Sequence, residues 1–169
     1  MTERAHLAIG SNLDERRTYL EAGLAAISAL PDTSLAAVSH IYETPPLGSV
    51  AQPDFLNAVC AIDTLLPPQE LLAAMLNIEN NYLRQRRIHW GPRTLDLDLL
   101  LYGDRIIASD TLVLPHPQMN DRNFVLVPLC EIESGTQLLD VNVLTHHVPE
   151  PIITNFDVHL SYLLFIHSR

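Results

Sequence analysis

The order of strand-like and helix-like segments predicts one α/β domain of the α+β class. Two segments, residues 14–30 and 68–83, carry apolar residues at helical spacing. Between and around them lie segments with strand character, the last of which is a leucine-rich run over residues 95–101. The resulting order β-α-β-β-α-β predicts a ferredoxin-like sandwich, in which a mainly antiparallel sheet is flanked by helices.

The first half of the chain is expected to form a strand, a helix and two further strands. Residues 5–10 are the expected first strand. Leucine and isoleucine recur at helical spacing over residues 14–30, and Pro31 is expected to end that helix. Residues 33–44 and 55–66 have strand character, so the Pro- and Gly-rich segment between them is expected to be a long loop.

The second helix, over residues 68–83, begins with Pro68, which is favourable in a first turn. Residues 84–92 lack apolar periodicity and end in Gly-Pro, so an exposed loop is expected there. The strand that follows should place Asp96 and Asp98 on one face, because side chains alternate along a strand. The other face is expected to carry Leu95, Leu97, Leu99 and Leu101.

The last third of the chain is predicted less completely. Residues 102–105, YGDR, are expected to form a turn. A short helix is expected from about Asn120 to the Pro128 region. Residues 146–169 contain two prolines before an apolar stretch, and they are compatible with an edge strand or a docked tail.

Composition narrows the class of protein. The 169 residues are 47% hydrophobic and 18% charged, which is typical of a globular domain, and no apolar run approaches the roughly 18 residues of a membrane span. The formal net charge of −10 argues against a nucleic-acid-binding surface. The start of the sequence lacks the apolar region of a signal peptide, and both cysteines have apolar neighbours. A cytoplasmic protein with no membrane or nucleic-acid partner is expected, as a monomer with a dimer possible.

The distribution of basic residues excludes several nucleotide-binding classes. The chain contains no lysine, which excludes a Walker P-loop and a protein-kinase fold, and no GxG, which excludes a dinucleotide fingerprint. All ten basic side chains are therefore arginines. Four of them lie close together just before the Leu/Asp strand, which favours a small anionic substrate; they are Arg84, Arg86, Arg87 and Arg93.

The Leu/Asp strand indicates phosphate chemistry. Asp96 and Asp98 on one strand face lie about 6.5 Å apart, so they repel each other unless a cation compensates. Hard oxygen ligands select Mg²⁺, and a magnesium pair that bridges nucleotide phosphates fits. Arg93 follows a rigid Gly-Pro pair, and its planar guanidinium suits phosphate oxygens. The alternative is a half-exposed strand with a polar outer face beside a solvated arginine turn.

The segment HWGPRTLDLDLL, residues 89–100, resembles the signature of the 6-hydroxymethyl-7,8-dihydropterin pyrophosphokinase family. The resemblance extends over most of residues 6–133 and implies a single domain over residues 1–169. The family transfers pyrophosphate from MgATP to the hydroxymethyl group of the pterin and releases AMP, in folate synthesis. The further segments that carry it are AIGSNL (8–13), YETPPLG (42–48), QPDFLNA (52–58) and LPHPQMNDRNFVLVPLCEI (114–132).

The resemblance assigns roles to particular residues. Asp96 and Asp98 would hold two Mg²⁺ ions, and Arg84 and Arg93 would clamp the phosphates and stabilise the leaving group. Contacts to ATP are implied, besides these arginines, for Glu79, Trp90, His116 and Arg122. Pterin contacts are implied for Thr44, Pro45, Leu47, Phe55, Asn57 and Phe124.

The residues themselves partly support these roles. A flat heteroaromatic ring stacks well between two phenylalanines, although Phe55 and Phe124 taken alone would be assigned to the core. Asn57 interrupts an apolar strand, and a buried amide needs partners that a ligand could supply. Trp90, the only tryptophan, is expected to pack near the site if residues 84–92 close over the substrates. The rival functions are a nucleotidyltransferase with the same carboxylates, which would release pyrophosphate, and a non-catalytic nucleotide- or pterin-binding module.

Overall fold

The computed structural model describes residues 1–48, 51–82 and 93–133. Predictions for residues 84–92 and for the tail after residue 133 lie outside these described residues. The single domain over residues 1–169 therefore stays a prediction.

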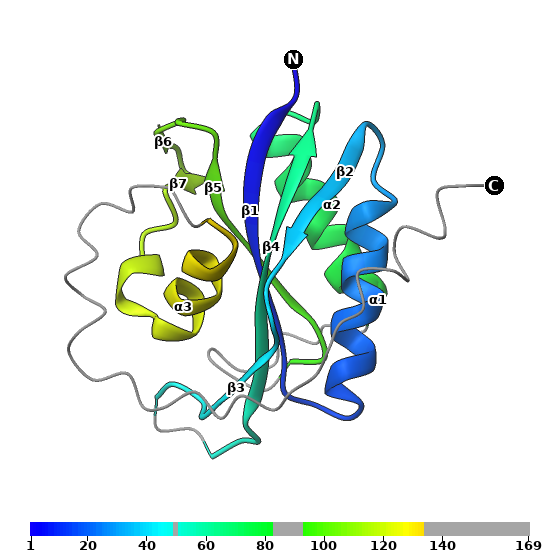
Figure 1. Ribbon diagram of the computed structural model, residues 1–169, viewed down its shortest axis with the longest axis vertical. Helices are drawn as coiled ribbons and strands as arrows, with labels where there is room; N and C mark the ends of the chain where they lie inside the picture. The colour runs from blue at the N-terminus through cyan, green and yellow to red at the C-terminus, as the bar shows by residue number, and fades with distance from the viewer. Residues whose placement is uncertain (49–50, 83–92, 134–169) are drawn as a thin grey trace.

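A central antiparallel sheet confirms the predicted ferredoxin-like sandwich (Figure 1). The strand order is β2-β4-β1-β5, and β3 also pairs with β4. Each of these pairings is antiparallel. The strands are β1 Glu3–Ser11, β2 Thr33–Val38, β3 Tyr42–Thr44, β4 Phe55–Thr64 and β5 Asp96–Tyr102.

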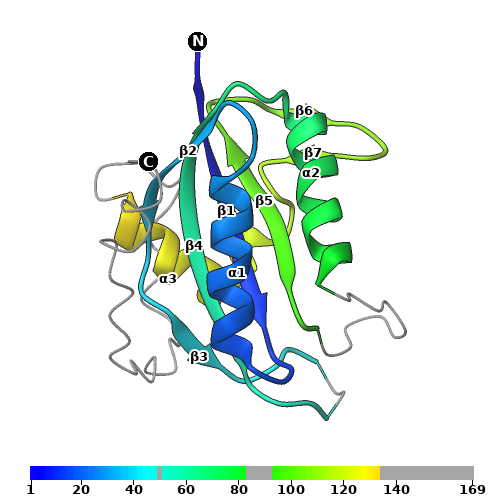
Figure 2. The same ribbon diagram turned by 90° about the vertical axis from the view of Figure 1, so that its right-hand side faces the viewer.

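Helices cover both faces of the sheet, and a separate apolar cluster lies on each face (Figures 1 and 2). The larger cluster joins one face of the sheet to α1 (Arg16–Ser28) and α2 (Pro68–Asn81). The smaller cluster joins the other face to α3 (Asn123–Ile132), which follows a short 3₁₀ turn, η1 (Met119–Asp121). Among the described helices, none combines the length and apolar character of a membrane span.

The leucine-rich strand β5 contains a β-bulge that the sequence pattern does not reveal. Leu7 pairs with Leu99, whereas the preceding residue His6 pairs with Leu101. The extra residue reverses the alternation of side chains beyond Leu99. Leu101 therefore packs in the α3 cluster, and the prediction that it shares a face with Leu99 is wrong.

The predicted strand over residues 33–44 is divided into β2 and β3 by Ser39. Its buried hydroxyl accepts a hydrogen bond from the Val59 amide at 3.0 Å and donates to the carbonyl of His40 at 2.8 Å. A serine side chain thus replaces part of the backbone ladder, which is how such residues interrupt regular structure. β3 consequently becomes a short separate edge strand.

After β5, one prediction needs correction and one small element was not predicted. Pro128 lies inside α3 and does not end the helix. The proline removes only its own amide bond to the carbonyl four residues earlier, and the buried residues Val125 and Leu129 on either side keep the helix packed on the sheet. The segment after the YGDR turn also forms a small hairpin, β6 (Ile107–Ala108) with β7 (Val113–Leu114), that the pattern does not predict.

Candidate active site

The hydrogen-bond register places four residues in one row across the sheet. Tyr42 pairs with Asn57, Asn57 with Gly10, and Gly10 with Asp96. Directly paired residues share a face, so Asn57 and Asp96 face the same side with only a glycine between them. Two strand spacings separate them, about 10 Å. The row therefore joins a predicted pterin residue to a predicted metal ligand.

The next row places Asp98 beside these residues. Ala8 pairs with both Val59 and Asp98, and Ala8 and Val59 pack in the α3 cluster. Asp98 therefore faces α3, where its Oδ2 lies 3.6 Å from a guanidinium nitrogen of Arg122. Both aspartates thus lie between the sheet and α3, on the face predicted for them.

The two aspartates form a site that a cation would stabilise. Burial, and next the negative charge of Asp96, raise the pKa of Asp98, while His116, Arg122 and Arg93 oppose the rise. Within residues 1–48, 51–82 and 93–133, no group of three or more His, Cys, Asp or Glu side chains could hold a metal ion. A metal bound to this carboxylate pair would therefore need further oxygens, such as those of a phosphate, which matches the usual coordination of Mg²⁺.

Arg93 is fixed at both its backbone and its side chain. One guanidinium nitrogen pairs with Oδ2 of Asp96. The backbone N–H of Arg93 donates to the side-chain Oδ1 of Asn12 at 2.7 Å, and the backbone N–H of Asn12 donates to the Arg93 carbonyl at 3.0 Å. Asn12 is 1% exposed and also donates from Nδ2 to Oε1 of Gln52 and to the Pro53 carbonyl, each at 3.0 Å. The buried side chain of Asn12 thus connects the backbone of Arg93 to the loop before β4.

Asn12 was not among the predicted site residues, although it belongs to the AIGSNL segment. The available signal is a polar residue directly after an apolar strand. Arg16 is a second unpredicted residue of this region: its Nη1 donates to the Asp54 carbonyl at 2.8 Å and lies 2.7 Å from Oε1 of Glu43. Both residues hold the segments that flank the predicted pterin positions.

Arg122 lies close to the aspartate pair, although its position before a helix suggests only a surface charge. Its guanidinium carbon lies 5.8 Å from the centre of the Phe124 ring, and it also contacts Oδ2 of Asp98. A second nitrogen donates to Oε1 of Gln118. Arg122 therefore connects the carboxylate pair to one of the two predicted pterin-stacking rings.

Hydrogen bonds of its backbone and ring position His116 near the aspartates. Its amide donates to the Leu100 carbonyl at 2.9 Å, and its Nδ1 accepts from the Gln118 amide at 3.2 Å. Burial is the largest influence on its pKa, which is lowered although Asp98 and Asp96 act in the opposite direction. With Nδ1 used as an acceptor, the proton lies on Nε2, which is the nitrogen that could donate to a ligand.

The Asn57 amide is oriented by its neighbours. Asn57 is 7% exposed, and its Nδ2 donates to Oγ1 of Thr44 at 2.8 Å. A Cβ added to Gly10 would lie 2.9 Å from Oδ1 of Asn57 and 3.8 Å from the Phe55 ring. Glycine at position 10 therefore leaves the space that this amide occupies. The other predicted pterin residues, Pro45 and Leu47, are exposed in the loop after β3.

For an Asn57 that binds pterin, as the resemblance implies, we expect Gly10→Ala to weaken that binding about tenfold, because the methyl group would displace an amide whose hydrogen bonds are worth roughly 1 kcal/mol each. The affinity for ATP should change little. Calorimetric titration with the pterin substrate and with an ATP analogue checks both. Gly23→Ala, on α1, is unsuitable as a control because its Cβ would meet Ile9 at 2.8 Å. Ala29→Gly, just after α1, serves instead; equal pterin affinities for both variants and the unmodified protein would contradict the expectation.

Glu79 lies on α2, and its predicted contact with ATP stays a prediction. Its side chain is buried on α2, and Oε1 accepts from the Leu97 amide at 2.8 Å. This carboxylate ties α2 to the part of β5 between the two aspartates, which supports a structural role. Arg84 and Trp90 lie outside the described residues, and their predicted contacts with ATP stay predictions.

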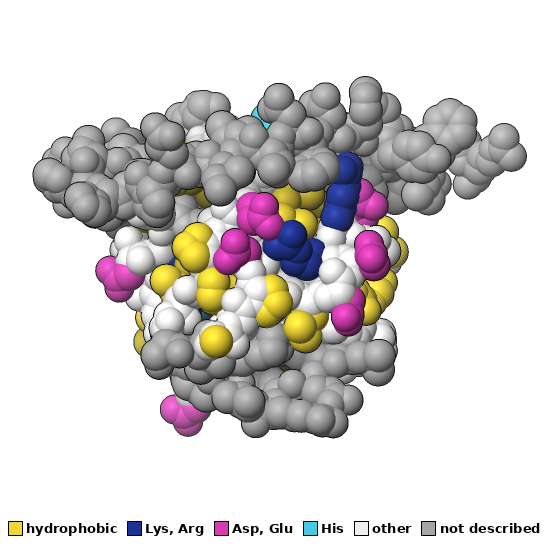
Figure 3. All heavy atoms as spheres, turned by 90° about the horizontal axis from the view of Figure 1, so that it is seen from below, with side chains coloured by type: hydrophobic (Ala, Val, Ile, Leu, Met, Phe, Trp, Pro, Cys, Tyr) yellow, Lys and Arg dark blue, Asp and Glu magenta, His cyan; other side chains and the backbone are white. Residues whose placement is uncertain are grey.

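Charged side chains also meet at the surface of this end of the molecule. Figure 3 views the molecule from the end where β3 lies in Figure 1. Basic and acidic side chains lie side by side there among hydrophobic ones.

Comparison with known proteins identifies sequences with the same pattern. The family model described as 7,8-dihydro-6-hydroxymethylpterin-pyrophosphokinase (HPPK) matches residues 6–134. The chain is 46% identical over 146 residues to the 2-amino-4-hydroxy-6-hydroxymethyldihydropteridine pyrophosphokinase of Haemophilus influenzae, covering 86% of this chain and 91% of the relative. It is 45% identical over 150 residues to the protein of the same name from Pseudomonas aeruginosa, covering 89% and 90%.

Solved structures agree in fold. A crystal structure of HPPK-DHPS in complex with substrates matches with a TM-score of 0.60 and 14% identity. A Plasmodium falciparum HPPK-DHPS with pterin and p-hydroxybenzoate matches with a TM-score of 0.61 and 16% identity. Each alignment covers 78% of this chain and 40% of the other, so the present chain spans about two fifths of those longer proteins. At these identities the likeness shows the fold alone.

Proposed function

This chain belongs to the 7,8-dihydro-6-hydroxymethylpterin-pyrophosphokinase family, and we propose that it transfers pyrophosphate from ATP to the hydroxymethyl group of 6-hydroxymethyl-7,8-dihydropterin in folate biosynthesis. The observation that carries the proposal is the row from Asn57 through Gly10 to Asp96. A ring-binding amide and a metal-binding carboxylate lie about 10 Å apart on one sheet face. This spacing suits a substrate that binds at one end and reacts at the other.

Asp96 and Asp98 would hold Mg²⁺ ions, two in our proposal, together with phosphate oxygens of ATP. Bound there, the metal supplies charge neutralisation on the phosphates. Burial and the negative charge of Asp96 raise the pKa of Asp98. A cation bound between the two carboxylates would remove their repulsion, which makes them a suitable pair of ligands. Asp96 and Asp98 would thereby hold the phosphates on the α3 face of β5, at the opposite end of the row from Asn57.

The cationic and neutral donors around the aspartates would bind the rest of the triphosphate. Arg93, held in place by Asn12, presents a planar guanidinium to phosphate oxygens. Arg122 and the Nε2–H of His116 supply donors near Asp98. Arg84 and Trp90 complete the nucleotide contacts in this proposal.

The pterin would lie between Phe55 and Phe124, with its ring edge on Asn57. One N–H of Asn57 Nδ2 donates to Thr44, so the second N–H can donate to the ring edge and Oδ1 can accept from it. The hydroxymethyl oxygen then attacks the β-phosphorus of ATP. The bond from that phosphorus to the oxygen shared with the α-phosphate breaks, the hydroxyl proton passes to solvent, and AMP leaves.

One incubation tests the proposal. The protein is mixed with ATP, Mg²⁺ and 6-hydroxymethyl-7,8-dihydropterin, and the nucleotide products are separated by chromatography. AMP in amounts equal to the diphosphorylated pterin is expected. Release of pyrophosphate with a nucleotidyl-pterin would instead indicate the nucleotidyltransferase. No AMP beyond a control without pterin would leave only a binding module.

Analytical ultracentrifugation checks the predicted monomer.

A further inference from the structure

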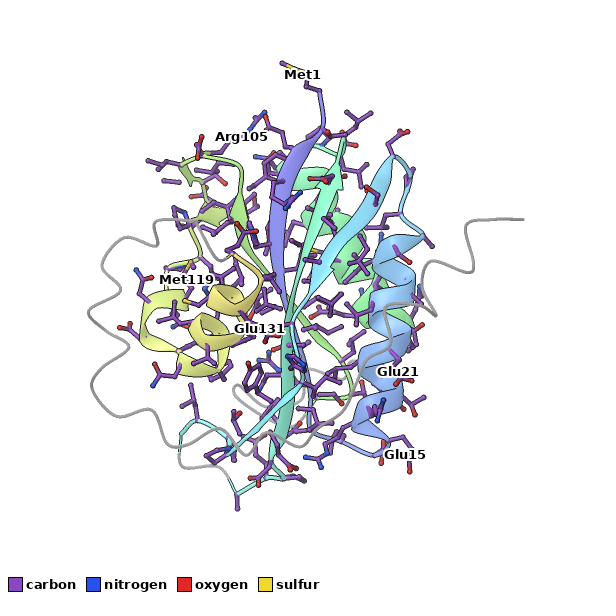
Figure 4. The ribbon with its side chains drawn as sticks, in the orientation of Figure 1. Met1, Glu15, Glu21, Arg105, Met119 and Glu131 are labelled. Atoms are coloured by element: carbon purple, nitrogen blue, oxygen red, sulfur yellow. The ribbon has the colours of Figure 1, made fainter. Side chains whose placement is uncertain are left out.

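A single carboxylate joins the C-terminal end of α3 to the start of β3. Both oxygens of Glu131 accept from the His40 amide at 3.1 Å, Oε1 also accepts from the His40 ring, and Oε2 accepts from the Tyr42 hydroxyl at 2.8 Å. The Glu131 side chain is 28% exposed, so these bonds are partly shielded from water. Figure 4 shows Glu131 at the inner side of α3, toward the sheet.

The two elements that Glu131 connects both carry parts of the proposed pterin site. β3 contains Thr44, which orients Asn57, and Tyr42 is the direct pairing partner of Asn57. α3 contains Phe124, roughly two helical turns before Glu131 and therefore on nearly the same face of the helix. The distance between β3 and α3 therefore affects how the Thr44–Asn57 pair lies relative to the stacking ring.

Among the described residues, few other bonds join β3 to α3. β3 has three residues and, within the described sheet, pairs only with β4. Packing through the α3 cluster holds the helix on the sheet, but apolar contacts are not directional and tolerate small shifts. A charged acceptor with three donors is directional and stronger than neutral hydrogen bonds.

The hydrogen bond from Tyr42 to Glu131 persists at neutral pH. Burial, followed by the hydrogen bond to Glu131 and by its charge, raises the pKa of Tyr42 to about 12. The phenol therefore remains a donor at neutral pH. Titration of Tyr42 does not release α3 from β3.

We propose that Glu131 is a positioning residue for the pterin site, which sets the spacing between Phe124 on α3 and the Thr44–Asn57 pair beside β3. This inference rests on the proposed function. In this role Glu131 acts through β3 and α3, so its removal should change how well the pterin fits and leave the phosphate side unchanged.

Glu131→Gln tests the inference, because the amide keeps the size but offers one oxygen to three donors. We expect the KM for the pterin and its calorimetric Kd to rise about tenfold, with kcat and the KM for ATP within about twofold. Hydrogen exchange of a peptide that covers residues 38–44 should become faster, since the His40 amide donates to Glu131. Tyr42→Phe removes one donor only and should raise the pterin KM less.

Glu21→Gln is the matched control. Glu21 accepts from Nε of Arg17 at 2.8 Å on α1, on the other face of the sheet from α3 (Figure 4). Its loss should change neither pterin binding nor exchange at residues 38–44. The inference is overturned if Glu131→Gln leaves pterin affinity unchanged, or if it lowers kcat and both affinities together with the melting temperature. Absence of turnover in the unmodified protein would refute the proposed function, whereas pterin binding and exchange still decide the role of Glu131.

Discussion

Asp98→Asn should lower kcat by about two to three orders of magnitude while the fold stays intact. A neutral amide is a weaker Mg²⁺ ligand, and the site acts by neutralising charge on the phosphates. The control is Asp63→Asn on β4, whose carboxylate pairs with Arg4 at 2.7 Å on the same face of the sheet but at the opposite end of β4 from the row. Steady-state rates at saturating Mg²⁺ and ATP provide the measurement. Near-normal turnover of Asp98→Asn would show that Asp98 faces away from the chemistry.

The same variant should be more stable than the unmodified protein when metal is absent. The pKa of Asp98 is raised on folding, so the folded state holds its proton more tightly than the unfolded state. Stability is therefore lost as pH rises from about 4, the ordinary pKa of an aspartate, through the raised value. Asparagine does not ionise, so the difference in melting temperature should be small near pH 4 and larger at pH 8. Because the Asp98 side chain is 35% exposed, solvent limits the size of the effect. A difference that does not grow with pH would contradict this expectation.

Arg93→Lys should lower kcat/KM for ATP by about a hundredfold, because lysine keeps the charge but cannot form two parallel bonds to a phosphate. The backbone bonds to Asn12 do not depend on the side chain, so the local structure should persist. A loss in kcat alone would place the interaction in the transition state, and a loss in both kcat and ATP affinity would place it in the ground state as well.

Arg105→Lys is the matched control for Arg93→Lys. Arg105 lies after β5, more than half exposed, with its guanidinium 3.4 Å from Oε1 of Glu3 (Figure 4). Lysine there should leave both constants unchanged. If Arg93→Lys behaves like this control, Arg93 has only a structural role, and the proposed phosphate contacts must come from other residues.

Elements with strong local signals were predicted well. The helices at 14–30 and 68–83 match α1 and α2 within two residues at each end, because an apolar stripe repeats over several turns in each. Asp96 and Asp98 were placed on the correct face of β5 by simple alternation. The proposal that the carboxylate pair and Arg93 are site residues rests on local chemistry, since like charges and a guanidinium within a few residues favour a common partner.

Interruptions of regular structure were not predicted, because each depends on a partner far away in sequence. Ser39 divides a strand through its bond to Val59, and the β5 bulge arises only in the pairing with β1. Pro128 would end an isolated helix, whereas packing on the sheet keeps α3 continuous. Periodicity within one segment carries no information about these contacts.

The sequence by itself determined the order of elements, the fold class and the chemical character of the site. Only the tertiary structure decided that Asn57, Gly10 and Asp96 form one row, that Asn12 holds Arg93, and that Glu131 joins α3 to β3. The physical reason is the range of the interactions. Apolar periodicity and charge are properties of neighbouring residues, whereas register, the bonds of a buried amide and the anchoring of an edge strand exist only after distant segments have packed together.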